Sequence, residues 1–94
     1  MNKAELLQSG KVIISKEPGN SMLPLIKSRQ PVELTPCRCD QAKIDDIVYC
    51  KVHGNYYTHL VVATDPKRGC LIANNKGHVN GWTRNVYGKV TKIL

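Results

Sequence analysis

The sequence predicts an all-β fold of mainly antiparallel strands with minimal helix, and two observations carry the prediction. Hydrophobic residues fill 41% of the 94 positions, but phenylalanine is absent and tryptophan occurs once. The core must therefore be built from valine, isoleucine, leucine and a few tyrosines, a composition that favours strands. The segments between apolar runs are short, which suits antiparallel neighbours rather than parallel crossovers. Because a chain of this length supports only one core, we expect a single domain over residues 1–94.

The N-terminal third is expected to hold little regular structure. Residues 1–10 form an arm in which residues 3–8 supply one or two helical turns, too few to be stable without tertiary support. Residues 11–15 are predicted to form a short strand. Residues 18–20, Pro-Gly-Asn, mark a loop. A second short extended run, residues 32–35, follows between two prolines.

The strongest local prediction is a β-hairpin. Residues 46–52 and 56–63 are rich in β-branched and aromatic residues, and they flank a short turn that contains Gly54-Asn55. This hairpin supplies two of about six expected strands.

The last third of the chain is predicted to continue the antiparallel pattern. Residues 65–69 form a turn that leads into a strand at residues 70–73. Residues 74–81 are expected to be a polar loop, and residues 86–93 close the chain as the last strand.

Charge and composition narrow the class of protein. Residues 1–47 carry seven Lys/Arg and six Asp/Glu, whereas residues 48–94 carry seven and one, so most of the net charge of +7 lies in the second half. No stretch approaches the roughly 18 apolar residues that span a bilayer, and the start lacks the apolar core of a secretory signal. We expect a cytoplasmic protein with no membrane association, whose four cysteines are reduced thiols.

Residues 19–24, Gly-Asn-Ser-Met-Leu-Pro, form the segment with the clearest chemical potential. A nucleophilic serine must be exposed, held by a turn and close to a base. Gly19 permits unusual backbone angles before Ser21, and Pro24 fixes the chain after it, while Met22 supplies an apolar anchor. Asn20 completes the candidate loop. Loop serines are common, however, and without further evidence Ser21 is interpreted as a turn or cap hydroxyl.

The spacing of Gly19, Ser21, Met22 and Pro24 resembles the segment around the nucleophile of signal peptidases, and LexA and UmuD-like peptidases share the Gly-x-Ser-Met part. That family continues with a Gly-Asp-Ile-Val strand and a strand that carries the base, and this chain has Asp45-Asp46-Ile47-Val48 and then His59-Leu60-Val61-Val62. The closing Val-Tyr-Gly-Lys-Val segment, residues 86–90, is similar to the family's last strand. The resemblance covers residues 12–93 and implies the LexA C-terminal or signal-peptidase β-fold in a small standalone form that would suit a bacteriophage protein.

The resemblance also implies roles for two residues. Ser21 would be the nucleophile and His59 the general base, as in the histidine-containing signal peptidases. Neutral imidazole, with an ordinary pKa of about 6.5, can accept the serine proton at neutral pH. The alternative role for His59 is a structural pairing across the sheet. The loop backbone N–H groups, notably that of Ser21, would form the oxyanion hole.

The sequence departs from the family at the orienting acid. His78 stands at the position of the acidic residue in Lys-Gly-Asp-x-Asn, and Asn80 is the remaining candidate to orient the base. Asp65 is the only carboxylate side chain after Asp46, so an acid would have to come from there or from earlier in the chain. A peptidase fold without turnover, kept as a protein-interaction module, is therefore a second hypothesis.

Two further functions remain as alternatives. Cys37-x-Cys39 offers soft metal ligands, but its spacing differs from the paired knuckles of zinc ribbons, and we expect no metal or other cofactor. The basic second half, with its aromatic residues, would suit a nucleic-acid-binding β-domain if those side chains lay exposed on one face. The main expected partner is a peptide or protein, and the sequence leaves a homodimer open.

Overall fold

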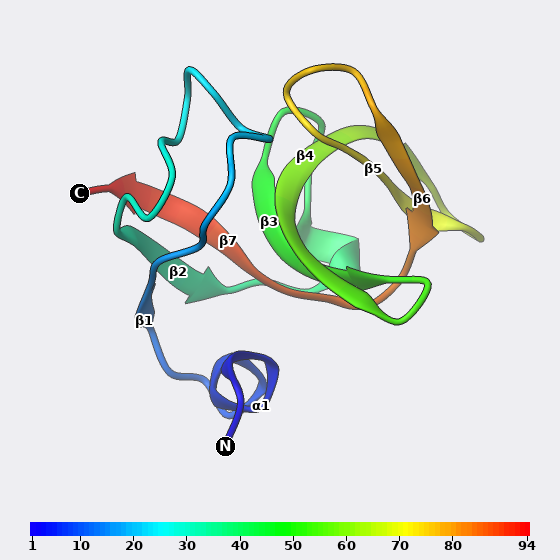
Figure 1. Cartoon of the computed structure of the whole chain (residues 1–94). Helices are drawn as coiled ribbons and strands as arrows, with labels where there is room; N and C mark the ends of the chain where they lie inside the picture. The colour runs from blue at the N-terminus through cyan, green and yellow to red at the C-terminus, as the bar shows by residue number, and fades with distance from the viewer.

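The structure is a computed structural model that describes residues 1–94, and it consists of one short α-helix, one 3₁₀ turn and seven strands (Figure 1). The elements in chain order are α1 (Lys3–Gln8), β1 (Ile13–Ser15), β2 (Val32–Pro36), η1 (Cys39–Gln41), β3 (Ile47–Val52), β4 (Asn55–Asp65), β5 (Gly69–Ala73), β6 (Val79–Thr83) and β7 (Val86–Ile93). All strands belong to one sheet in the order β1-β2-β7-β3-β4-β5-β6, and every neighbouring pair is antiparallel.

The all-β antiparallel prediction is confirmed, with seven strands instead of about six. The predicted hairpin is β3–β4, but its turn is His53-Gly54 and Asn55 already pairs with Val52. The prediction of a polar loop over residues 74–81 was wrong at its end, because Val79 to Gly81 belong to β6. Val79 and Gly81 pair with Ala73 and Ile72 of β5, and Asn80 lies at the register shift between these two pairs. Asn80 and Gly81 have weak strand preference, so the strand depends on its neighbour β5.

The part of the sheet from β3 to β6 curls strongly, so that β6 approaches β3 (Figure 1). The Thr83 hydroxyl on β6 donates to the Lys51 carbonyl on β3 at 2.6 Å. A Cβ atom added to Gly81 would lie 2.8 Å from the His53 ring. The curl encloses the larger cluster of buried residues, which is built mainly from valine and cysteine side chains. It also allows a side chain on β6 to reach one on β4, two strands away.

The buried residues form two clusters rather than the single core expected from the chain length, and the smaller one lies between α1 and the other end of the sheet. Ala4 and Leu7 of α1 are buried against Val32, Leu34 and Tyr49. The predicted helical turns therefore receive the tertiary support that a six-residue helix requires. No helix in the structure has both the length and the apolar character needed to span a membrane.

Candidate active site

Ser21 lies in the connection between β1 and β2, and local residues give that connection a defined shape. Gly19 has φ +107°, a conformation that favours glycine. Met22 is buried, with 5% of its surface exposed, and its carbonyl accepts a hydrogen bond from the N–H of Ile26 at 3.0 Å. Ser21 is half-buried between these two anchors.

The serine loop is also fastened to the loop between β5 and β6. The Asn75 backbone N–H donates to the Ser21 carbonyl at 2.9 Å, and the Asn75 side-chain amide donates to the Leu23 carbonyl at 2.8 Å. Asn20 contributes its carbonyl to a turn that closes on the N–H of Leu23, and Pro24 is exposed. Asn75 thus holds the backbone of the candidate nucleophile in place.

The structure brings Ser21 and His59 together. His59 lies on β4 and is 7% exposed, and its Nε2 is 3.0 Å from the Ser21 Oγ. This separation is within the hydrogen-bond reach that a base and its nucleophile require. The His59 ring also stacks on Tyr57, with 4.9 Å between ring centroids.

Asn80 completes a chain of three side chains. Its Oδ1 lies 2.7 Å from the His59 Nδ1. When Nδ1–H donates to this oxygen, the Nε2 lone pair faces the Ser21 hydroxyl and can accept its proton. The arrangement is Ser21–His59–Asn80, with the side-chain amide at the position that a carboxylate holds in a serine–histidine–aspartate triad.

The other two residues considered for orienting the base are not bonded to it. His78 is exposed, and no hydrogen bond joins its side chain to His59. The Asp65 carboxylate accepts hydrogen bonds from the N–H groups of Lys67 and Arg68 in the β4–β5 turn, and these bonds lower the pKa of Asp65. The Asp65 carboxylate therefore stabilises the β4–β5 turn and forms no hydrogen bond with His59.

Burial lowers the pKa of His59 below its ordinary value of 6.5. The hydrogen bond to Asn80 and the negative charge of Glu17 partly oppose this effect, whereas His78 adds to it. Neutral imidazole is the form that accepts a proton, and the lowered pKa favours this form of His59 at neutral pH.

We expect reaction at Ser21 to follow the titration of His59. The rate should rise with pH through a midpoint below 6.5 and become level at higher pH, where His59 is fully neutral. Folding stability should fall as pH decreases through about 6.5, since the unfolded chain then binds a proton that the folded chain resists. The expected pH dependence of the rate is tested by measuring how fast a serine-directed fluorophosphonate labels the protein between about pH 5 and about pH 8. The expected effect of His59 on folding stability would be contradicted if a His59→Gln variant lost as much stability as the wild type when the pH falls below about 6.5.

Glu17 is a residue near the site that the sequence did not point to. Its carboxylate accepts a hydrogen bond from the Thr58 hydroxyl at 2.7 Å, next to His59, and lies 3.8 Å from the Lys3 Nζ. Its carbonyl accepts the N–H of Arg29 at 2.7 Å. Glu17 is thus a carboxylate from earlier in the chain that lies near His59. Its negative charge raises the pKa of His59, and its hydrogen bond is to Thr58 and not to His59.

The space beside Ser21 offers donors for a developing oxyanion. The backbone N–H groups of Ser21 and Met22 donate to no acceptor within the protein, so they are free to bind a negatively charged oxygen. A cavity of about 40 Å³ adjoins Ser21, with Met22, Ile26 and Val32 among its apolar walls. Ser21 as candidate nucleophile, His59 on β4 as candidate base and the unpaired N–H groups of the serine loop therefore lie together.

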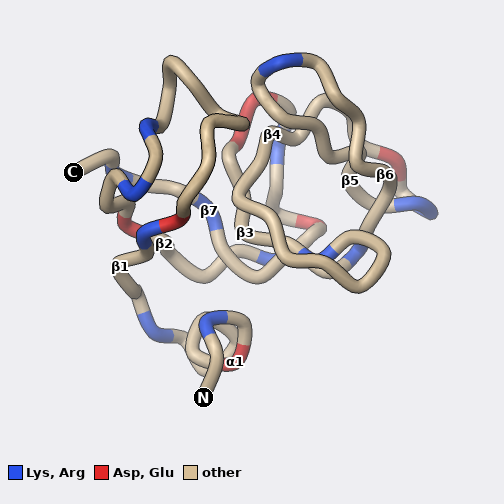
Figure 2. Tube along the Cα trace, viewed as in Figure 1, with Lys and Arg blue, Asp and Glu red and all other residues tan.

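The two alternative sites considered from the sequence, a metal site and a nucleic-acid-binding face, are not formed by the residues in question. No three His, Cys, Asp or Glu side chains lie where they could hold a metal ion. The aromatic residues divide among three places: Tyr49, Tyr56 and Tyr87 pack together, Tyr57 stacks on His59, and Trp82 lies under Arg68. Figure 2 shows the Lys and Arg residues spread around the whole trace. The fold thus offers no single face on which all the aromatic residues and the basic charge coincide.

Comparison with known proteins found no matching family model, no matching curated protein and no matching solved structure. The functional argument therefore depends on the geometry of Ser21, His59 and Asn80.

Proposed function

We propose that this chain is a serine peptidase of the signal-peptidase and LexA type, acting on an extended peptide segment. The observation that carries the proposal is the continuous pair of hydrogen bonds from Ser21 Oγ to His59 Nε2, at 3.0 Å, and from His59 Nδ1 to Asn80, at 2.7 Å. Either bond alone would suit a structural histidine. Together they fix both the tautomer and the direction of the base.

The chemistry follows from these positions. His59 Nε2 takes the proton of Ser21 as its Oγ attacks the peptide carbonyl carbon, and the free N–H groups of the serine loop bind the oxyanion. His59 then gives the proton to the leaving amine, and water releases the acyl group by the same steps in reverse. Asn80 is neutral, so it orients the ring but stabilises the imidazolium less than a carboxylate would. We infer slow turnover in a reducing compartment such as the cytoplasm, which the four free thiols suit.

Peptide cleavage can be tested without knowing the natural substrate. A proteome-derived peptide library is incubated with the wild-type protein and with Ser21→Ala, and new peptide termini are mapped by mass spectrometry. We expect termini that share a sequence pattern and are absent with Ser21→Ala. Ser9→Ala, which removes an exposed serine on the helix cap, should behave as wild type.

The second hypothesis is a binding module that retains the site without turnover. It is favoured by one observation, the lack of any carboxylate hydrogen-bonded to His59. Identical peptide profiles for the wild type and Ser21→Ala would exclude the peptidase and leave this role.

A further inference from the structure

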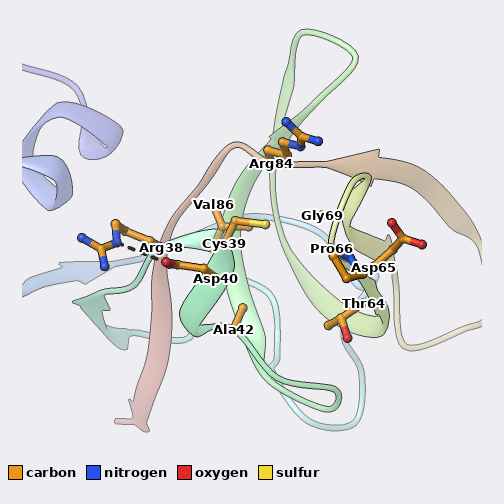
Figure 3. Close-up of a pocket in the computed structure, with 10 residues that line it drawn as sticks. All are labelled: Arg38, Cys39, Asp40, Ala42, Thr64, Asp65, Pro66, Gly69, Arg84 and Val86. Atoms are coloured by element: carbon orange, nitrogen blue, oxygen red, sulfur yellow. Dashed lines mark hydrogen bonds and ion pairs between the residues drawn. The ribbon is translucent and has the colours of Figure 1, made fainter.

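A second cavity, of about 720 Å³, lies between η1, the β4–β5 turn and the start of β7 (Figure 3). Asp65, on its wall, is six residues beyond His59 on the same strand, a distance of roughly 20 Å along β4. The cavity is thus separate from the serine site. Cys39 stands on its wall, and Figure 3 shows the Cys39 sulfur directed across the cavity toward the side formed by Pro66 and Gly69.

The cavity gives access to a pair of thiols. The Cys39 Sγ lies 3.8 Å from the Sγ of Cys70, which is fully buried on β5 behind the cavity wall. Neither of the remaining cysteines has a thiol partner, since the Cys37 thiol approaches the carbonyl of Arg38 and the Cys50 thiol that of Tyr57. Disulfide formation requires the Cys39 and Cys70 sulfur atoms to move from 3.8 Å to about 2 Å apart.

The cavity carries one cation that no carboxylate neutralises. Arg38 pairs with Asp40, and Arg68 on the adjoining turn pairs with Asp65. Arg84 on the cavity wall donates instead to the backbone carbonyl of Lys67. Its guanidinium is therefore available to a carboxylate on a ligand.

We propose that Cys39 and Cys70 form a thiol–disulfide exchange site for an anionic, low-molecular-weight disulfide that enters this cavity. Cys39, as thiolate, attacks one sulfur of the ligand, which forms a mixed disulfide and releases the first ligand thiol. Cys70 then gives its proton to water and attacks the Cys39 sulfur, which breaks the bond between Cys39 and the ligand and forms the Cys39–Cys70 bond. The second ligand sulfur leaves as a thiolate and takes a proton from water. The protein loses two hydrogen atoms and the ligand gains them.

The order of attack follows from the surroundings of the two thiols. Burial raises the pKa of Cys70 to about 12, so Cys70 stays protonated and out of reach of the ligand. Once the mixed disulfide exists, Cys70 already lies beside the sulfur atom that it must attack. This proximity makes the second step intramolecular and compensates for the low reactivity of a protonated thiol. Cys39 is therefore the attacking thiol and Cys70 the resolving thiol.

The proposal is tested by incubating the protein with glutathione disulfide and digesting it with trypsin. Trypsin places each cysteine in a different peptide, because it cleaves after Arg38, Lys43 and Lys51. We expect a linked pair of peptides, residues 39–43 and 69–76, and a protein lighter by two hydrogen atoms. Cys70→Ser should stop at one glutathionyl group on Cys39, and Cys39→Ser should gain no link. Cys37→Ser, changed two residues away, should react as wild type.

The role of Arg84 needs a separate comparison. Arg84→Gln should slow the reaction with glutathione disulfide about fivefold and leave the reaction with neutral 2-hydroxyethyl disulfide unchanged. Equal rates of both disulfides in the two proteins would overturn the role of charge. Four free thiols after prolonged incubation, a link to another cysteine, or a wild-type rate for Cys39→Ser would overturn the site. Circular dichroism identifies any variant that fails to fold, and none of these results depends on the peptidase proposal.

Discussion

Labelling of Ser21 by a fluorophosphonate probe should fall by about 10² to 10⁴-fold in His59→Ala and disappear in Ser21→Ala. The reason is the 3.0 Å contact between the two side chains, which lets His59 remove the serine proton as the Oγ attacks phosphorus. The probe needs no knowledge of the natural substrate. Labelling rates and the modified residue are measured by mass spectrometry of the intact and digested protein.

Two controls match these variants. His78→Ala removes an exposed histidine whose side chain forms no hydrogen bond with Ser21 or His59, and Ser28→Ala removes another serine of the same loop, whose Oγ accepts the N–H of Gly19. Both should still be labelled at Ser21. Labelling of His59→Ala at the wild-type rate would show that the imidazole is not the base and would end the peptidase proposal.

The second large effect is expected at Asn80. Asn80→Ala removes the acceptor that lies 2.7 Å from His59 Nδ1, so the ring loses its fixed tautomer and labelling should fall by roughly 10²-fold. Asn80→Asp supplies a carboxylate at the same place. It should raise the pKa of His59 and increase the plateau rate, because the imidazolium formed during the attack is then stabilised.

The measurement is the pH dependence of labelling for the wild type and both variants. Asn80→Asp should move the midpoint to higher pH than in the wild type, which a purely structural role for Asn80 would not do. Asn55→Ala, an exposed asparagine at the start of β4, provides the control. An unchanged midpoint in Asn80→Asp would refute the assigned contact with the base.

Much of the fold could be predicted because its signals are local. The runs that became β3, β4 and β7 carry their own β-branched and aromatic residues, and a two-residue turn joins the first two. β6 was not predicted, because Asn80 and Gly81 have weak strand preference and the strand depends on its pairing with β5 and on the curl toward β3. Such long-range pairing leaves little trace in the segment itself.

The same distinction applies to the site. Ser21 and His59 could be proposed from a loop motif and its spacing to a strand, and the structure places their side chains in contact. Glu17 and Asn75 could not be predicted, because their hydrogen bonds to Thr58 and to the serine loop join residues 41 or more positions apart. Nothing in the composition around either residue distinguishes it from an ordinary polar loop position.

The location of β6 at the end of the strand order has a consequence for the stability of the Ser21–His59–Asn80 arrangement. A terminal strand is paired through its backbone on one side only, by β5, and such strands open at lower energetic cost than central ones. Asn80 lies on β6, and Asn75 lies in the loop that precedes it. If β6 and this loop detached transiently, His59 would lose its hydrogen bond to Asn80 and the serine loop would lose its hydrogen bonds to Asn75 at the same time. The arrangement can therefore come apart before the buried core unfolds.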